Sequence, residues 1–570
     1  MSYPSINDKK FYSKVNSKFR KYTIPKKQKT FKQFCFPKEF KHQPSQLLPA
    51  DFLSSKTPYK NLLIFHQIGS GKTCAAVQIG EEWKHKRKII VVAPASLTGN
   101  YRKELRSKCA GNEYITDEER ERLSELHPSS REYKKIIQES DKRIDKYYLI
   151  VSFNKFVDLI ARRKLRDNKY IIIIDEVQNI VSETGSWYNS VYNFIQKSSD
   201  ATRVVIMSAT PMFDKPYEIG LTMNLLKLKE EFPKTHGEFN TEFLESYEEK
   251  GLIKYRVQNL DKFKKMVKGV VSYYRGAPPY VYPHAKIKYV NCVMSEFQKR
   301  VYRQIIKNDN HFKKKKLDDM EELPVNFFLG PRYASNIVYP NKKVGDKGYV
   351  SFKGRHLDMD NLQKYSIKIY KIMQKVLRAK GLVFIYSNFK QYGGLKAIIK
   401  VLRHYGYKDY HKEGEGSKRF AVWTGDQSIR LKDEIRDVFN NTDNLDGSKL
   451  KIILGSPSIK EGISLMGVRQ VHILEPYWNQ SRLDQIIGRA VRYCSHKNLE
   501  KEYRNVKVYI YIATHPQIPL SIDKYIRDLS IRKNVLIKDF ELGLKESAID
   551  CHILKNANVS KGEKDIKCEK

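Results

Sequence analysis

The chain has 570 residues, too many for one hydrophobic core, so we expect two to four domains. Lysine and arginine exceed aspartate and glutamate by 42 (106 against 64), which favours a polyanion partner such as nucleic acid, although a lysine-rich genome would raise the same count. No apolar run approaches the roughly 18 residues of a membrane span, and the cysteines show no CxxC pair or zinc spacing, so we expect a soluble protein of a reducing compartment, with no membrane partner and no disulfide framework.

The first 40 residues are polar and basic and predict a weakly ordered arm, either a solvated tail or a specific contact. After them, short continuous apolar runs alternate with helical patterns. These runs lie at 61–65, 88–93, 147–151, 170–174 and 203–207. Continuous apolar strands are typical of a parallel sheet that helices cover on both faces, and such sheets bind ligands at their carboxyl edge.

A glycine-rich turn, HQIGSGKT, follows the first of these strands and precedes a helical stretch. Its candidate nucleotide-binding residues are Gly69, Ser70, Gly71, Lys72 and Thr73. Glycines let backbone amides close around phosphates, the lysine would contact the β and γ phosphates, and the threonine hydroxyl would hold Mg²⁺. A strict P-loop has glycine where His66 stands.

Two further turns follow predicted strands. Asp175 and Glu176 come directly after the four isoleucines of 171–174. An aspartate there can bind Mg²⁺, and the next carboxylate can orient and deprotonate the attacking water. The second turn, SATP at 208–211, has small hydroxyl residues that suit a coupling element.

A second set of apolar runs predicts another parallel sheet, at 381–387, 419–423, 450–454, 469–474 and 506–512, with a helix at 429–440. The turn at 455–465, GSPSIKEGISL, offers amides and hydroxyls to a phosphodiester backbone. Arg489 and Arg492 follow on a helix that begins near Ser481. Guanidinium groups at this spacing can stabilise the charge of a transferring phosphoryl group, although a basic surface helix would read the same way.

The ordered motifs resemble those of superfamily 2 helicase-like ATPases. They are GSGKT, APASL (93–97), SFNKF (152–156), DEVQ, SATP, FIYSNF (384–389), GSPSIKEGISL and QIIGRAVR (485–492). PASLTGNYRKEL and EPYWNQSRLDQIIGRAVR resemble the Swi/Snf-type branch. KGVVSYYRG, RYASNIVYP, GRAVRYCSH and LKESAIDC resemble ATPases of large cytoplasmic DNA viruses, such as the poxvirus early transcription factor small subunit and nucleoside triphosphatase I.

This resemblance implies ATP and Mg²⁺ as cofactors and a role for each matched residue. Lys72 and Thr73 would bind nucleotide and metal, and Asp175 and Glu176 would handle metal and water. Gln485, Arg489 and Arg492 would sense the γ-phosphate. Gly455, Ser456 and Gly462 would lie where the family touches nucleic acid and ribose. Gln46 would read adenine, with Gln43 as the alternative, and Gln178 replaces the histidine of DExH members, which argues against processive unwinding of that type.

The resemblance also implies an α/β fold of two RecA-like lobes in tandem with helical insertions. We expect a basic arm (1–40), a first lobe (41–228), a helical inter-lobe region (229–360), a second lobe (361–540) and a tail (541–570). The four lysines at 313–316 precede an acidic stretch and form either a solvated loop or a nucleic-acid or polymerase contact.

Three functions remain open from the sequence. The first is a DNA-dependent ATPase that translocates and serves viral transcription at initiation or termination, with a viral RNA polymerase or a second factor subunit as partner, in the virion and host cytoplasm. The second is a processive helicase of replication or RNA remodelling. The third is a scaffold subunit with modest ATPase activity.

Overall fold

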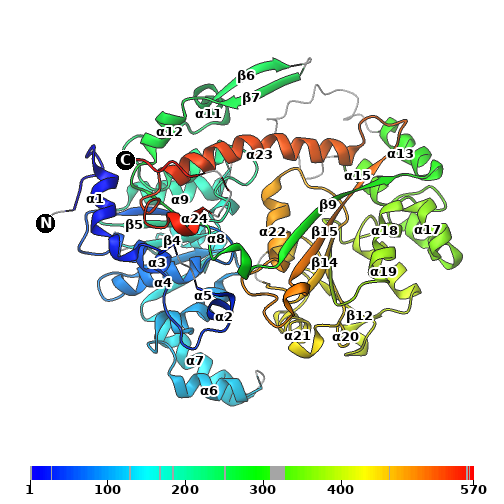
Figure 1. Cartoon of the computed structure of the whole chain (residues 1–570), viewed down its shortest axis with the longest axis horizontal. Helices are drawn as coiled ribbons and strands as arrows, with labels where there is room; N and C mark the ends of the chain where they lie inside the picture. The colour runs from blue at the N-terminus through cyan, green and yellow to red at the C-terminus, as the bar shows by residue number, and fades with distance from the viewer. Residues whose placement is uncertain are drawn as a thin grey trace. The chain divides into compact units, whose positions relative to one another are not determined.

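The computed structural model describes residues 3–26, 29–127, 130–165, 169–182, 185–249, 252–308, 328–460, 463–559, 563 and 565–570. The chain forms two compact units, one of residues 1–278 and 535–570 and the other of residues 279–534. Each unit is built around its own parallel sheet with helices packed against it (Figure 1). The α/β fold with two parallel-sheet lobes, expected from the sequence, is thereby confirmed. The lysine run at 313–316 lies outside the described residues.

The sheet of the first unit has six parallel strands in the order β3-β2-β4-β5-β1-β8. They are β1 (Asn61–His66), β2 (Ile89–Ala93), β3 (Tyr148–Ser152), β4 (Ile171–Asp175), β5 (Arg203–Met207) and β8 (Val271–Tyr274). Every residue of β2, β4 and β5 is buried, as continuous apolar runs require. Five strands match the predicted runs, and the four-residue β8 adds a sixth beside β1, with Leu63 opposite Val271.

Helices and one hairpin complete the first unit. The helices are α1 (Phe11–Lys18), α2 (Phe31–Cys35), α3 (Pro44–Phe52), α4 (Lys72–Trp83), α5 (Thr98–Leu105), α6 (Asp117–Glu125), α7 (Arg131–Asp145), α8 (Phe153–Ala161), α9 (Ser186–Lys197), α10 (Glu218–Asn224), α11 (His236–Phe243), α12 (Leu260–Met266) and α24 (Lys555–Asn558). Short 3₁₀ turns are η1 (Arg20–Tyr22), η2 (Lys108–Ala110) and η3 (Val177–Asn179), and β6 (Leu244–Glu249) pairs antiparallel with β7 (Leu252–Val257).

The N-terminal segment is packed, so the expectation of a weakly ordered arm is wrong for its described part. Phe11 and Val15, one turn apart on α1, are fully buried in the same core cluster as Leu62 of β1. Because the exposed face of α1 is basic, composition alone did not reveal its buried apolar stripe. The chain's other end joins the same core, where Ile549 donates its N–H to Val271 O at 2.8 Å.

The expectation of no disulfide bonds is also contradicted. Cys74 is bonded to Cys109, and Cys551 is bonded to Cys568. The sequence separations of 35 and 17 residues carry no signal of their own, because the fold brings these cysteines together. Cys292 is free and buried.

The sheet of the second unit has seven parallel strands in the order β11-β12-β13-β10-β14-β15-β9. They are β9 (His284–Val293), β10 (Leu382–Tyr386), β11 (Lys408–Asp409), β12 (Arg419–Trp423), β13 (Ile452–Gly455), β14 (Val468–Ile473) and β15 (Asn505–Thr514). Along β10, Val383 and Ile385 enter one core cluster while Leu382, Phe384 and Tyr386 enter another. The strand is therefore buried on both faces, which explains its continuous apolar run.

Helices surround this second sheet. They are α13 (Glu296–Asn308), α15 (Leu329–Asn336), α16 (Gly345–Ser351), α17 (Met359–Tyr365), α18 (Ile367–Val376), α19 (Leu395–His404), α20 (Tyr410–Glu413), α21 (Ile429–Phe439), α22 (Gln480–Ala490) and α23 (Ile522–Glu546), the last of which runs across the boundary between the units. The 3₁₀ turns are η4 (Pro279–Val281), η5 (Gly354–Leu357), η6 (Thr442–Asn444), η7 (Pro457–Lys460) and η8 (Lys501–Tyr503). Among the described residues, no helix is both long enough and apolar enough to cross a membrane.

Candidate nucleotide-binding site

The glycine-rich turn between β1 and α4 has the backbone conformation that a phosphate-binding loop requires. Gly69 and Gly71 have φ angles of 78° and 82°, where any other residue is strained. A Cβ atom on Gly71 would also lie 2.4 Å from Nε2 of Gln46, so the Gln46 side chain would have to move. The helix α4 begins directly afterwards at Lys72, and the amides of a helix N-terminus favour an anion.

Lys72 lies against the two carboxylates at the end of β4. Its Nζ is 3.1 Å from Oε1 of Glu176 and 3.9 Å from Oδ1 of Asp175. Glu176 has a φ of 51°, which is uncommon for a residue other than glycine and positions the carboxylate on a tight turn. The first unit thus brings together three predicted residues from two distant parts of the chain.

The environment of Asp175 suits a metal ion. Burial raises the pKa of Asp175 to about 6, and the ammonium of Lys72 acts in the opposite direction. A carboxylate in such a place gains from a further cation, and oxygen donors are what Mg²⁺ prefers. Thr73, which follows Lys72 as the second residue of α4, carries a hydroxyl. Asp175 and Thr73 are therefore a donor set of the right chemistry for Mg²⁺.

Gln178 connects this carboxylate turn to the SATP turn after β5. Its Nε2 donates to the Glu176 carboxylate, and its Oε1 accepts from the Ser208 hydroxyl at 2.8 Å. The Ser208 hydroxyl also accepts the N–H of Thr210 at 2.9 Å. The glutamine that replaces the family's histidine is thus the physical link between Glu176 and the second turn.

Of the two candidate adenine readers, Gln46 lies nearer the phosphate loop. It is buried on α3, with its amide nitrogen against Gly71. Its Oε1 accepts the N–H of Gln43 at 2.8 Å, so the two glutamines form the capping box at the start of α3. Gln43 is less buried and is the N-cap residue of that helix.

His66, which stands where a strict P-loop has glycine, is part of a buried series of hydrogen bonds that the sequence did not predict. Its Nε2 lies 2.9 Å from the Ser272 hydroxyl, and this hydroxyl donates to Asp550. Burial lowers the pKa of His66 to about 3, so the imidazole is neutral. Ser272 and Asp550 lie within the stretches KGVVSYYRG and LKESAIDC, so these stretches meet at the strand that leads into the phosphate loop.

In the second unit, the predicted arginines converge on one main-chain oxygen. Nη1 of Arg489 lies 3.2 Å from the carbonyl oxygen of Ile463, and Nη2 of Arg492 lies 3.4 Å from the same atom. Gln485 lies one turn before Arg489 on α22, and its carbonyl accepts from Nε of Arg489 at 3.3 Å. The three residues predicted to sense the γ-phosphate are therefore one local cluster.

The predicted nucleic-acid residues are placed only in part. Gly455 ends β13 and Ser456 is buried, with its hydroxyl 3.1 Å from that of Ser458. Gly462 lies outside the described residues.

A buried ionic network that the sequence did not predict holds the second unit together. Lys368 pairs with Asp523, both fully buried, and Lys368 Nζ donates to Asn336 Oδ1 at 2.8 Å. Asn336 in turn donates to Glu475 at 3.1 Å. Asn336 and Glu475 lie in the quoted stretches RYASNIVYP and EPYWNQ, so these motif residues meet inside the unit.

Comparison with known proteins decides the family. The SNF2-related domain family matches residues 40–336, and the helicase conserved C-terminal domain matches residues 368–494. The chain belongs to the SNF2-related helicase family. It is an ATP-hydrolysing, helicase-like enzyme of superfamily 2, and its resemblance to viral members of that superfamily is confirmed.

The relatives are proteins of large DNA viruses. The chain is 52% identical to a "Putative ATP-dependent RNA helicase" of Acanthamoeba polyphaga mimivirus, over 100% of this chain and 99% of that protein. It is 26% identical to a "Putative helicase" of invertebrate iridescent virus 3, over 98% of this chain and 57% of that protein. It is 25% identical to a "Termination factor NPH-I homolog" of African swine fever virus, over 86% of this chain and 76% of that protein.

Proposed function

We propose that this chain is a nucleic-acid-stimulated ATPase that uses ATP hydrolysis to move along DNA in viral transcription. The observation that carries the proposal is the connected set in the first unit, in which Lys72 contacts Glu176 and Gln178 joins Glu176 to Ser208. Such a set can hold a nucleotide's phosphates, orient water and report the reaction to a second turn.

Each candidate site residue of the first unit has a definite chemical role in this proposal. Lys72 gives its charge to the phosphates and releases the carboxylates from the ion pair. Asp175 and Thr73 would hold Mg²⁺, which would neutralise charge on the phosphate oxygens. Glu176 then takes a proton from the attacking water, and Gln178 keeps the carboxylate oriented. Gln46 orients the base from its position beside the loop.

The arginines of the second unit would stabilise charge on the γ-phosphate, as the family's motif implies. We propose Arg489 and Arg492 for this role and Gln485 as the residue that positions Arg489. Main chain around Gly455, Ser456 and Gly462 would contact the nucleic-acid backbone. A viral RNA polymerase or a second factor subunit is the proposed partner, and the virion and host cytoplasm the proposed location.

The name of one relative supports transcription, because a termination factor homolog is 25% identical over 86% of this chain. A second candidate function is RNA unwinding, which the printed name of the 52% identical mimivirus protein favours. We favour the DNA translocase because the resemblance to viral ATPases implies it and because Gln178 stands where DExH helicases have histidine.

One assay separates the two functions. ATP turnover is measured with duplex DNA, single-stranded DNA and single-stranded RNA, together with strand separation on matched duplexes. The proposal predicts the largest stimulation by DNA and no strand separation. Stimulation by RNA alone, with unwinding of an RNA duplex, would replace it by the second candidate. A Lys72→Ala variant in every arm shows that the turnover belongs to this chain.

A further inference from the structure

The disulfide between Cys74 and Cys109 is attached to the phosphate-binding end of α4. Cys74 is the third residue of that helix and follows Thr73 directly, and Cys109 belongs to η2, beyond α5. Both cysteines are buried. The bond therefore ties the first turn of the helix behind the phosphate loop to a segment 35 residues further along the chain.

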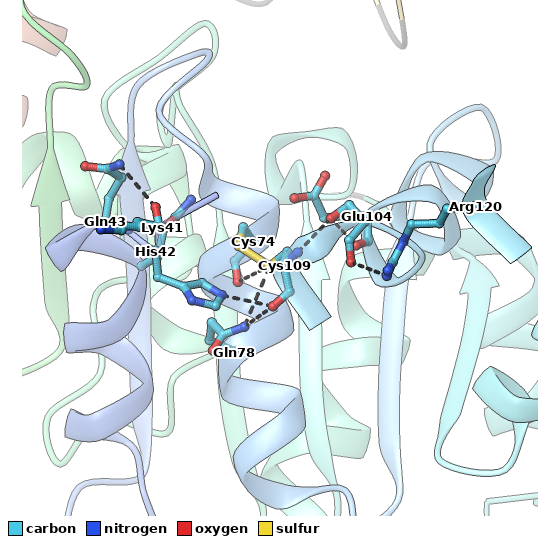
Figure 2. The surroundings of a disulfide bond; sticks show 10 residues. Lys41, His42, Gln43, Cys74, Gln78, Glu104, Cys109 and Arg120 are labelled. Atoms are coloured by element: carbon cyan, nitrogen blue, oxygen red, sulfur yellow. Dashed lines mark hydrogen bonds between the residues drawn. A yellow bond between two sulfur atoms is a disulfide. The ribbon is translucent and has the colours of Figure 1, made fainter. Parts of the chain in front are cut away.

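Cys109 also holds the segment that leads to the candidate adenine reader. Its carbonyl oxygen lies 2.9 Å from Nε2 of His42 and accepts from Nε2 of Gln78 at 2.6 Å. Figure 2 shows His42 and Gln78 directed toward Cys109, with the sulfur–sulfur bond beside them. His42 precedes the capping box that Gln43 and Gln46 form at the start of α3. The side-chain amide of Gln46 packs against Gly71. One residue thus fixes the phosphate end and the base end of the site relative to each other.

We propose that Cys74 and Cys109 are an oxidation site that sets the ATP affinity of the first unit. The disulfide form holds the start of α4 and the start of α3 at the spacing that nucleotide binding requires. The dithiol form releases this constraint and binds ATP more weakly, because part of the binding free energy is then spent on ordering these segments. The inference rests on the proposed function, in that the phosphate loop binds ATP.

The chemistry is thiol–disulfide exchange with a small thiol. One thiolate attacks a sulfur of the pair, forms a mixed disulfide and displaces the other cysteine as a thiolate, which takes up a proton. A second small thiol then displaces the remaining cysteine, and the small molecules leave as their disulfide. A small disulfide reverses both steps. Because the bond is buried, exchange requires local opening of the segment around η2.

Because ATP binding and formation of this disulfide are thermodynamically linked, bound ATP should also affect the disulfide. If the disulfide tightens ATP binding by some factor, bound ATP must favour the disulfide over the dithiol by the same factor. ATP with Mg²⁺ should therefore shift the reduction midpoint of this pair toward the disulfide. The disulfide between Cys551 and Cys568 lies in the same unit and is the matched control, because neither of its cysteines belongs to α4, to η2 or to the segment that begins α3.

The test compares full-length wild-type protein in its oxidised form and after dithiothreitol, by titration with a fluorescent ATP analogue and Mg²⁺. We expect reduction to raise the Kd for the analogue on the order of 5-fold or more. The double variant Cys74→Ser with Cys109→Ser should bind weakly under both conditions and no longer respond to dithiothreitol. The double variant Cys551→Ser with Cys568→Ser should respond as the wild type does.

Two outcomes would overturn the inference, and a third would overturn the proposed function. Equal Kd values for both forms, with only the melting temperature changed, would make the bond a structural link. Stoichiometric zinc retained by the reduced wild type and lost in His42→Ala would assign the pair to a metal site, since donor atoms of His42, Cys74 and Cys109 lie within 4.8 Å of one another. Failure of the analogue to bind either form would instead refute the proposed function itself. If the serine variants do not fold, the wild-type titrations before and after dithiothreitol still decide between the first outcome and the inference.

Discussion

The two units hold their predicted charged residues against different kinds of group. In the first unit, Lys72 is neutralised by Glu176 and Asp175 at ion-pair distances. In the second unit, Arg489 and Arg492 both lie against a main-chain oxygen, the carbonyl of Ile463. The difference teaches that Lys72 must leave two carboxylates before it can contact a phosphate, whereas Arg489 and Arg492 are held beside each other by the main chain.

Removing the cation of the first unit should have a large effect on turnover. Lys72→Ala should lower ATP turnover by about 10²- to 10³-fold, because a positioned charge on the phosphates is lost. The fold should persist, since Lys72 is not among the buried core residues. Lys86→Ala, on the exposed part of the same unit, is the control and should leave turnover unchanged. Turnover within a few-fold of wild type for Lys72→Ala would refute the phosphate-loop assignment.

The second unit should lose stability, and not catalysis alone, when its buried network is broken. Lys368→Met leaves Asp523 charged and buried without its cation, which should cost about 3–5 kcal/mol of unfolding free energy. Urea unfolding, followed by a probe in the second unit, measures this loss. A loss below about 1 kcal/mol would show that Asp523 finds other compensation.

A pH-dependent difference in stability is expected in the first unit. Burial raises the pKa of Asp550 to about 7, above its ordinary value of 3.8. Between these values the unfolded chain loses a proton that the folded chain keeps, so the Asp550 contribution to stability falls as the pH rises from about 4 to about 7 and changes no further above it.

Asp550→Asn removes this titration and keeps a group that can hydrogen-bond Ser272 and the N–H of Tyr273. Relative to wild type, the variant should gain up to about 1.4 kcal/mol of unfolding free energy per pH unit across that window. Urea unfolding of both proteins at pH 5 and pH 7 provides the comparison. Parallel pH profiles for the two proteins would mean that Asp550 is already ionised in the fold.

The smallest expected effect concerns the link between the two turns of the first unit. Gln178→Ala removes the bonds to Glu176 and Ser208, and should lower nucleic-acid-stimulated turnover by about 10-fold while unstimulated turnover changes less. Ser208→Ala should also lower nucleic-acid-stimulated turnover, by a smaller factor. Equal losses in both kinds of turnover would make Gln178 a simple support of the catalytic carboxylate.

Most strands that could be predicted are unbroken apolar runs, whereas β8 is buried but is interrupted by Ser272. Strands such as β4 read as unbroken apolar runs because both faces are covered. The strand β9 was missed because it is an edge strand whose exposed residues, such as Lys286 and Lys288, interrupt the apolar pattern. The helix α1 was missed because only one stripe of it is buried.

The site residues that could be predicted are contiguous in the chain, and those that could not be predicted come together only in the fold. The residues from Gly69 to Thr73, and the pair Asp175 and Glu176, are contiguous in the chain, so their motifs could be recognised. The partners of His66, which are Ser272 and Asp550, lie more than 200 residues away and follow only from the fold. The pairing of Cys74 with Cys109 likewise depends on where α4 and η2 lie in space.

The central claim is that nucleic acid stimulates ATP hydrolysis through the charged arginines of the second unit. It is tested most directly by the turnover of wild type and Arg492→Ala, with and without saturating duplex DNA, alongside the Kd for ATP. We predict that Arg492→Ala loses stimulated turnover by about 10³-fold or more and changes the Kd far less. A variant that keeps its maximal stimulated rate and loses ATP affinity instead would contradict the account, because Arg492 would then bind the ground state and not the transition state.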